Sequence, residues 1–271
     1  MEVLKAIFLG VIQGLTEFLP VSSSGHLILF KKLFGLEAET FGLTFDIALH
    51  IATLVAVVVV LWKDIFPLLK KPLQKYVGLL VVATVPAGIV GVLFSDQIDE
   101  ISQSGGFLGI AFLLTAAVLW ISESVGRRTK EKEDITYKDA LLIGGAQAVA
   151  VIPGISRSGS TLSAGLLTGL KKGPAITFAF MMSIPIIAAS AVLGVKNIIE
   201  MPGDFQWTVV LAGMVAAGLS GYFAVRFVLD FFRRRSVKIF AVYVALAGVF
   251  VLVDQLFFQN FFDTFLVFSM K

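Results

Sequence analysis

A cluster of polar side chains interrupts the apolar N-terminal part of the chain between Gln13 and His26. It contains Glu17, the hydroxyls of the serines at 22–24 and one of only two histidines in the chain. An unpartnered polar group is costly in an apolar environment, so this density of polar groups needs a chemical reason. Glu17 has the chemistry of a base or a metal ligand, and His26 is the obvious proton carrier near pH 7.

The same residues admit structural interpretations. A buried His26 can simply be hydrogen-bonded at a turn, and we expect at least one of the serines to cap the helix that follows. Gln13 and Glu17 are spaced i, i+4, so on a helix their side-chain oxygens face the same way. A hard divalent cation, Mg²⁺ or Ca²⁺, held by this pair together with phosphate oxygens and water would suit so sparse a ligand set.

A second polar segment begins at Gln147 and continues through residues 153–161. At its centre stands Arg157, whose guanidinium forms a planar fork that matches two phosphate oxygens at once. Hydroxyls and backbone amides surround it as neutral donors, at Gly154, Ser156, Ser158, Gly159 and Thr161. We also expect Thr161 to open a short helix, whose free amides favour an anion. The segment therefore predicts an oxyanion site.

The charge of Arg157 has one structural alternative, an internal ion pair with Glu17. An arginine in an apolar half of a membrane protein costs about 2.5 to 3.5 kcal/mol, so an anionic partner is required in either case. Asp46 and His50, again i, i+4, are expected to support the site or line its cavity, unless Asp46 still lies at the membrane interface. Arg226 is close enough to the end of a span to snorkel, and we assign it no role.

Composition places the chain among integral membrane proteins. Apolar residues make up 57% and charged residues 15%, with a mean hydropathy of +0.92, whereas soluble domains are about 45–50% apolar. Without cysteine, disulfides and thiol chemistry are excluded. Glu2 and Lys5, with no small-residue cleavage site after them, argue against a removable signal peptide. Six segments are long enough to cross a core of about 30 Å as helices: 41–62, 76–94, 106–122, 174–195, 207–231 and 237–257.

Each polar segment lies between two apolar stretches that are too short to cross a membrane comfortably. The first joins 3–18 to 27–34, and the second joins 139–152 to 161–170. Two half-length helices around a polar tip describe a re-entrant hairpin. Each half of the chain, 1–123 and 139–258, then has one hairpin and three crossings. Because a hairpin makes no net crossing and three is odd, the second half begins on the opposite side of the membrane, and the halves form inverted repeats. The predicted fold class is an all-α polytopic membrane protein with six full transmembrane helices plus two re-entrant helix hairpins in a single domain.

Basic residues are distributed unevenly between the two faces of this topology. Fifteen lie in the loops 63–75, 124–138, 171–173 and 232–238, and five lie on the opposite face. Arg157 and Arg226, within the membrane, complete the total of 22. By the positive-inside rule the basic face is cytoplasmic, and both termini lie outside.

The two polar segments together resemble the signature motifs of the undecaprenyl-diphosphate phosphatase family, also called bacitracin-resistance proteins. The motifs read QGLTEFLPVSSSGH at 13–26 and PGISRSGST at 153–161, and the likeness covers nearly the whole chain in length, motif order, span count and the Phe45-Asp46 pair. The resemblance implies dephosphorylation of a polyprenyl diphosphate to the monophosphate carrier of envelope glycan synthesis, with divalent-metal dependence and an active site open to the outer face. The family's first acidic position is Gln13 here, so only Glu17 is carried over as the essential carboxylate.

We therefore expect a phosphatase of the plasma membrane, with the two hairpin tips forming one cavity. Arg157 and its loop would hold the diphosphate, Glu17 would bind metal or orient the nucleophile, and His26 would transfer the proton. The attacking group is either Ser23 or water. Expected partners are a polyprenyl diphosphate, membrane lipids and, as an option, a second copy in a homodimer, but no nucleic acid. The alternative is a secondary transporter or flippase for polyprenyl phosphate, because inverted repeats with broken helices typify transporters.

Overall fold

The computed structural model describes residues 1–36, 38–125, 128–200 and 206–262, which are almost wholly helical. Within these ranges no β-strand occurs, and a single bridge joins Lys130 to Leu170. Arg127 of the basic loop and residues 263–271, which carry the C-terminus predicted to lie outside, are not among the described residues. The longer helices are α1 (Glu2–Phe18), α2 (Ser23–Leu33), α4 (Leu43–Val60), α6 (Lys75–Leu93), α8 (Leu108–Ser124), α9 (Tyr137–Val149), α10 (Arg157–Leu167), α11 (Lys172–Glu200), α12 (Trp207–Arg234) and α13 (Lys238–Val253).

Shorter helices occupy the connections, including the predicted loop 63–75 and the segment that follows the predicted span 76–94. They are α3 (Ala38–Phe41), α5 (Trp62–Lys70), α7 (Ser95–Ser104), a 3₁₀ turn η1 (Lys132–Asp134) and a π-helical turn η2 (Asp254–Phe258). Helices α5 and α7 were not predicted, because both are amphipathic and too polar to resemble spans. The α7 helix turns Ser95, Ile98 and Ser102 toward the interior, a spacing that places all three on one helical face.

Five of the helices are long and apolar enough to cross a membrane: α4, α6, α11, α12 and α13 with its continuation η2. They coincide with five of the six predicted spans. The remaining predicted span, 106–122, corresponds to α8, which has 17 residues and is shorter than the other five. A polytopic membrane protein therefore fits the architecture, and the crossing by α8 stays a prediction.

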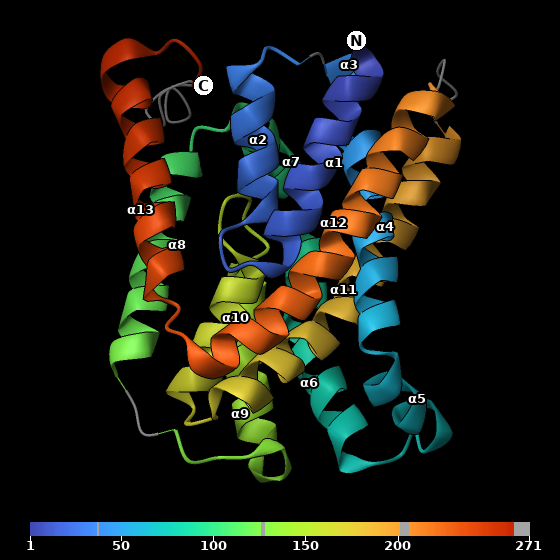
Figure 1. The fold of residues 1–271 in the computed structure, drawn as a ribbon, viewed down its shortest axis with the longest axis vertical. Helices are drawn as coiled ribbons and strands as arrows, with labels where there is room; N and C mark the ends of the chain where they lie inside the picture. Colours follow the sequence, from blue (N-terminus) through green and yellow to red (C-terminus); the bar gives the residue numbers. More distant parts are fainter. Residues whose placement is uncertain (37, 126–127, 201–205, 263–271) are drawn as a thin grey trace.

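Two helix pairs approach each other from opposite ends of the molecule (Figure 1). The α1–α2 pair descends from the end that carries the N-terminus, the α9–α10 pair rises from the other end, and their connecting loops meet near the middle. The predicted start of the second half-helix at Thr161 is wrong. Helix α10 begins four residues earlier, at Arg157, because Ser156 caps it by accepting a hydrogen bond from the Gly159 N–H at 3.0 Å.

The second helices of the two pairs correspond position by position. Both α2 and α10 have 11 residues, and in both the N-cap serine accepts from the N–H of a glycine three positions on. Both are followed by a glycine with positive φ, Gly35 and Gly169. Residue numbers in α10 are thus 134 higher than those of their counterparts in α2. Consequently two helix N-termini, with their free N–H groups and positive dipole ends, face the meeting point of the tips.

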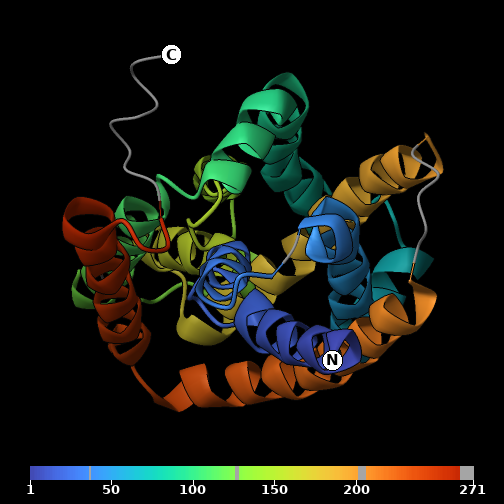
Figure 2. The same cartoon turned by 90° about the horizontal axis from the view of Figure 1, so that it is seen from above.

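Close packing against α12 fixes the position of α1. Gly10 and Gly14 lie directly against the backbone of Gly213 and Ala217, so a Cβ at either glycine would collide with it. At the end of α1, Phe18 is buried and packs edge-on against Phe180 of α11, with ring centroids 5.5 Å apart. Seen from above, the α1–α2 pair lies in the middle of the molecule with α12 along one side (Figure 2). This packing holds the end of α1, with Glu17, at the centre of the fold.

Candidate active site

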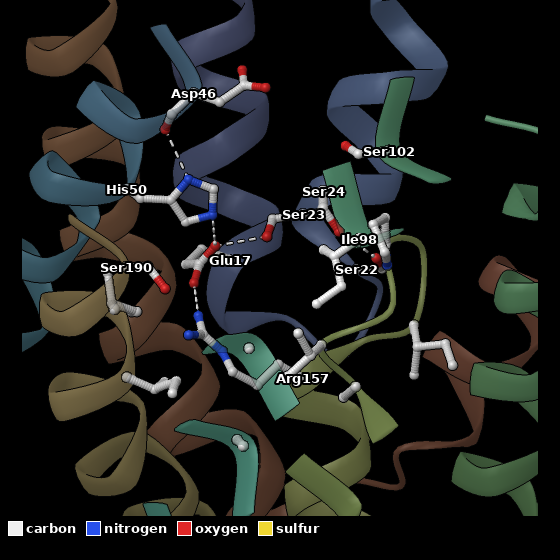
Figure 3. Close-up of a pocket in the computed structure, with 18 of the residues that line it drawn as sticks. Glu17, Ser22, Ser23, Ser24, Asp46, His50, Ile98, Ser102, Arg157 and Ser190 are labelled. Atoms are coloured by element: carbon white, nitrogen blue, oxygen red, sulfur yellow. Dashed lines mark hydrogen bonds and ion pairs between the residues drawn. The ribbon is translucent and has the colours of Figure 1, made fainter. Parts of the chain in front are cut away.

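A cavity of about 440 Å³ lies beside the meeting tips. Its walls come from α1, α2, α4, α6, α7, α11 and the α9–α10 connection. Glu17, Ser23, Asp46, His50 and Arg157 gather on one part of the wall (Figure 3). Most of the remaining lining is apolar and comes from several elements, among them α6 and α11. A polar centre within an apolar wall suits a ligand that combines an anionic group with a hydrocarbon part.

The carboxylate of Glu17 joins the groups of the polar centre. Its Oε1 forms an ion pair with Nη2 of Arg157. Its Oε2 accepts hydrogen bonds from Gln13 Nε2 at 2.8 Å and from Ser23 Oγ at 2.6 Å. His50 Nε2 lies 3.5 Å from the same oxygen. Because the Glu17 side chain is fully buried, its charge depends above all on Arg157, and removing the arginine would leave a costly buried charge.

The ion pair between Arg157 and Glu17, the structural alternative for the charge of Arg157, is thus present. It does not remove Arg157 from the cavity, because 23% of the arginine side chain remains exposed there. A guanidinium has five N–H donors, and the contact with Glu17 engages only one of its nitrogens. Arg157 can therefore hold an anionic ligand while it neutralises Glu17.

The predicted donors around Arg157 divide into two groups. Ser156 and Ser158 line the cavity, and their predicted contact with a substrate stays a prediction. Both also connect the start of α10 to other helices. Ser158 Oγ donates to the carbonyl of Leu19, which follows α1, at 2.9 Å, and the Ser156 N–H donates to Thr115 Oγ1 on α8 at 3.0 Å. Thr115 was not predicted, although a threonine within an apolar span is a signal for such a contact.

The second group does not line the cavity. The Gly154 N–H donates to Ser24 Oγ at 3.3 Å, and the Gly159 N–H is taken by the Ser156 cap. Thr161 lies inside α10, where its hydroxyl donates to the carbonyl of Arg157 at 2.9 Å. These three residues shape the tip, and this arrangement does not place them against a ligand.

His26 also lies away from the cavity lining and is buried. Its Nδ1 donates to the Ser22 carbonyl at 2.8 Å, so in the neutral ring Nε2 accepts from the Tyr243 hydroxyl, also at 2.8 Å. The ring packs between Tyr243 and Phe112, with centroid distances of 5.6 and 5.4 Å. This is the turn-stabilising interpretation considered for His26, and it leaves neither ring nitrogen available to a substrate.

The histidine that reaches the polar centre is His50 on α4 (Figure 3). Its Nδ1 donates to the Asp46 carbonyl at 2.8 Å, which leaves Nε2, the atom facing Glu17, to exchange a proton. The carboxylate of Asp46 instead accepts from Lys31 Nζ at 2.6 and 2.7 Å. The i, i+4 pair of polar residues within an apolar span was the signal in the sequence.

The predicted ligands Gln13 and Glu17 are not arranged to hold a metal ion. Gln13 does not line the cavity, and both oxygens of Glu17 already accept from protein donors. Throughout the described part of the chain, no group of three His, Asp or Glu side chains could hold a cation. A divalent-metal requirement stays a prediction, in which the ion would arrive with the phosphate oxygens of the substrate.

Comparison with known proteins gives one consistent result. The family model described as bacitracin resistance protein BacA matches residues 6–250. An undecaprenyl-diphosphatase of Carboxydothermus hydrogenoformans is 41% identical over 258 residues, which cover 94% of this chain and 98% of the relative. The undecaprenyl-diphosphatase of Halothermothrix orenii is 38% identical over 256 residues, with 93% and 98% covered. That of Oceanobacillus iheyensis is 41% identical over 261 residues, with 90% and 94% covered.

Proposed function

The chain belongs to the bacitracin resistance protein BacA family, and we propose that it hydrolyses undecaprenyl diphosphate to the monophosphate and inorganic phosphate. The observation that carries the proposal is the convergence of Arg157, Ser23 and His50 on the carboxylate of Glu17 at the wall of one cavity. Arginine supplies an anion clamp, serine a nucleophile, and the carboxylate and imidazole supply proton acceptors. This combination suits hydrolysis of a diphosphate, and release of the monophosphate would return the lipid carrier to cell-wall glycan synthesis and confer bacitracin resistance.

The cavity suggests how the lipid lies. The diphosphate would rest against Arg157 and the free N–H groups at the start of α10, where the guanidinium and the helix dipole favour negative charge. The polyprenyl chain would follow the apolar lining contributed by α6 and α11.

In the proposed reaction, Ser23 Oγ attacks the terminal phosphorus and passes its proton to Glu17 Oε2, to which it already donates at 2.6 Å. A bond forms between Oγ and phosphorus, the anhydride P–O bond breaks, and the lipid monophosphate leaves. Water then attacks the phosphoserine, inorganic phosphate leaves, and the proton returns to Oγ. His50 takes and returns protons through Nε2, while Arg157 stabilises the charge on the transferring group.

We propose the membrane arrangement that the basic residues favour. The loops 63–75, 124–138, 171–173 and 232–238 would lie in the cytoplasm, and both termini outside the plasma membrane. The two helix pairs would be re-entrant hairpins of the inverted repeats 1–123 and 139–258. The matched lengths and caps of α2 and α10 support this repeat. The cavity, which Asp46 and α7 border on the side of the N-terminus, would then open outward.

The test is phosphate release from undecaprenyl diphosphate by the purified protein in detergent, beside a Glu17→Gln variant. The wild type should release phosphate, and the variant should lose at least about 10²-fold in rate, the usual worth of a positioned base. Chelator should lower the rate and Mg²⁺ should restore it, without a change in thermal unfolding, if the ion arrives with the substrate. A wild type that binds the lipid and moves it across liposomes without releasing phosphate would favour the flippase alternative.

A further inference from the structure

A buried glutamine on the cavity wall has no hydrogen-bond partner. Gln147, near the end of α9, is 1% exposed and lines the cavity. Neither its amide nitrogen nor its amide oxygen has a partner among the described residues. Buried polar groups are almost always paired, so an unpaired amide beside a cavity indicates a missing ligand.

The other helix pair shows what such a glutamine binds. Gln13 lies nine residues before Ser22, the N-cap of α2, and Gln147 lies nine residues before Ser156, the N-cap of α10. Gln13 Nε2 donates to the carboxylate of Glu17, four residues on, at 2.8 Å. The residue four positions after Gln147 is Val151. The α9–α10 pair therefore has the glutamine amide but lacks a carboxylate to bind it.

We propose that Gln147 is a further substrate-positioning residue, whose Nε2 donates to a phosphate oxygen of the bound diphosphate. This inference rests on the proposed function. Gln147 and Arg157 line the same cavity, and the neighbouring lining of α6, Ala87 and Gly88, has no side-chain donor or acceptor. A phosphate that carries one proton also offers an O–H to the amide oxygen, so one ligand can satisfy both atoms of the amide.

The decisive variant is Gln147→Leu, which removes both polar atoms and keeps a similar volume. KM for undecaprenyl diphosphate should rise about 10- to 100-fold, the worth of a hydrogen bond to a charged group, while kcat changes much less. The melting temperature should stay the same or rise, because a buried unpaired amide is lost. A KM within twofold of the wild type would overturn the inference, whatever the melting temperature.

A matched control is Gln255→Leu. Gln255 is also buried, but its Nε2 donates to the carbonyls of Gly105 and Gly106 at 3.2 and 2.9 Å. This variant should show the reverse pattern, a lower melting temperature with KM unchanged. If both variants raise KM equally, a general loosening of the fold explains the effect and the role of Gln147 is refuted.

A second variant, Gln147→Glu, distinguishes a phosphate donor from a ligand of a substrate-borne cation. A carboxylate repels phosphate, so KM should exceed that of Gln147→Leu; a KM at or below the wild-type value would contradict donation to phosphate. Binding of a non-hydrolysable methylene analogue of the lipid diphosphate separates this inference from the proposed function. If the wild type releases no phosphate but binds the analogue at least tenfold more tightly than Gln147→Leu does, the proposed reaction fails and the binding role stands. Equal binding would overturn the binding role.

Discussion

His50 Nε2 lies 3.5 Å from Oε2 of Glu17, the same oxygen that accepts the Ser23 hydroxyl at 2.6 Å. Because Nδ1 of His50 donates to the Asp46 carbonyl, the free lone pair of the neutral ring is on Nε2. One carboxylate oxygen thus connects a serine hydroxyl to an imidazole that can accept a proton. In the proposed reaction, this connection gives the proton of the attacking Ser23 hydroxyl a destination.

Replacement of His50 by alanine should lower kcat by about 10²- to 10⁴-fold, the range for a positioned acid or base. The side chain is partly exposed to the cavity, so its loss should change thermal unfolding little. Steady-state kinetics and a melting curve on the same preparation give both quantities. Normal turnover in His50→Ala would move the proton-transfer role to another group.

His26→Ala should behave differently, because His26 is buried and bonded to Tyr243 and the Ser22 carbonyl. The substitution also removes a buried ring that packs between Tyr243 and Phe112 and leaves a cavity there. The melting temperature should therefore fall, and any loss of activity should follow the loss of folded protein. A loss of kcat above 10²-fold at an unchanged melting temperature would instead restore the catalytic role first predicted for His26.

Asp46→Asn tests the role of the Asp46 carboxylate separately from that of its backbone carbonyl. The backbone carbonyl orients His50, whereas the carboxylate binds Lys31. The substitution keeps the carbonyl and weakens an ion pair that is partly exposed and is worth about 0 to 1 kcal/mol. We expect turnover within about threefold of the wild type. A loss comparable to that of His50→Ala would place the carboxylate itself in the reaction.

Arg157→Lys keeps the positive charge but removes the planar fork that binds two oxygens at once. Phosphate release should fall at least about tenfold while the protein still folds and inserts. Arg226→Lys is the matched control, because Arg226 is exposed and donates to Tyr222 one turn earlier on α12. Equal rates for the wild type and Arg157→Lys would require the phosphate to bind elsewhere.

The proposed orientation can be tested with single cysteines in this cysteine-free chain. Cysteines at Ser102 and Gln259 should react with an impermeant reagent applied to intact cells, whereas one at Thr129 should be protected until the membrane is opened. We expect this pattern because the loops on the side of Thr129 carry most of the basic residues and should therefore face the cytoplasm. Labelling at Thr129 alone would invert the arrangement.

Much of the fold could be predicted because the physical signals are local. Apolar length marks a span, and five predicted spans coincide with helices of sufficient length and hydropathy. Helix ends were less certain: α10 starts at Arg157 and not at Thr161, because the choice among several serines as the cap depends on which hydroxyl reaches a free N–H. Glu17 and Arg157 were expected at one site because the two hairpin tips were predicted to meet, and their ion pair, kept as an alternative for Arg157, is present.

Which of the two histidines lies beside Glu17 could not be predicted from local signals. His26 lies closer to Glu17 in the sequence, but a helix N-terminus turns it toward Tyr243, a contact across 217 positions. His50 reaches Glu17 only through the packing of α4 against α1 and α12. Gln147 was visible as part of the second polar segment, yet its lack of a partner is a property of the packed structure. Long-range contacts of this kind have no local signal.

The stereochemistry at the transferred phosphorus tests the central claim most directly, namely that Ser23 is the nucleophile beside Glu17 and Arg157. A lipid diphosphate made chiral at its terminal phosphorus with sulfur and oxygen isotopes would be hydrolysed, and the configuration of the released thiophosphate determined. Transfer to Ser23 and then to water involves two in-line displacements, so the account predicts net retention of configuration. Net inversion would show that water attacks the diphosphate directly, and would contradict the role proposed for Ser23.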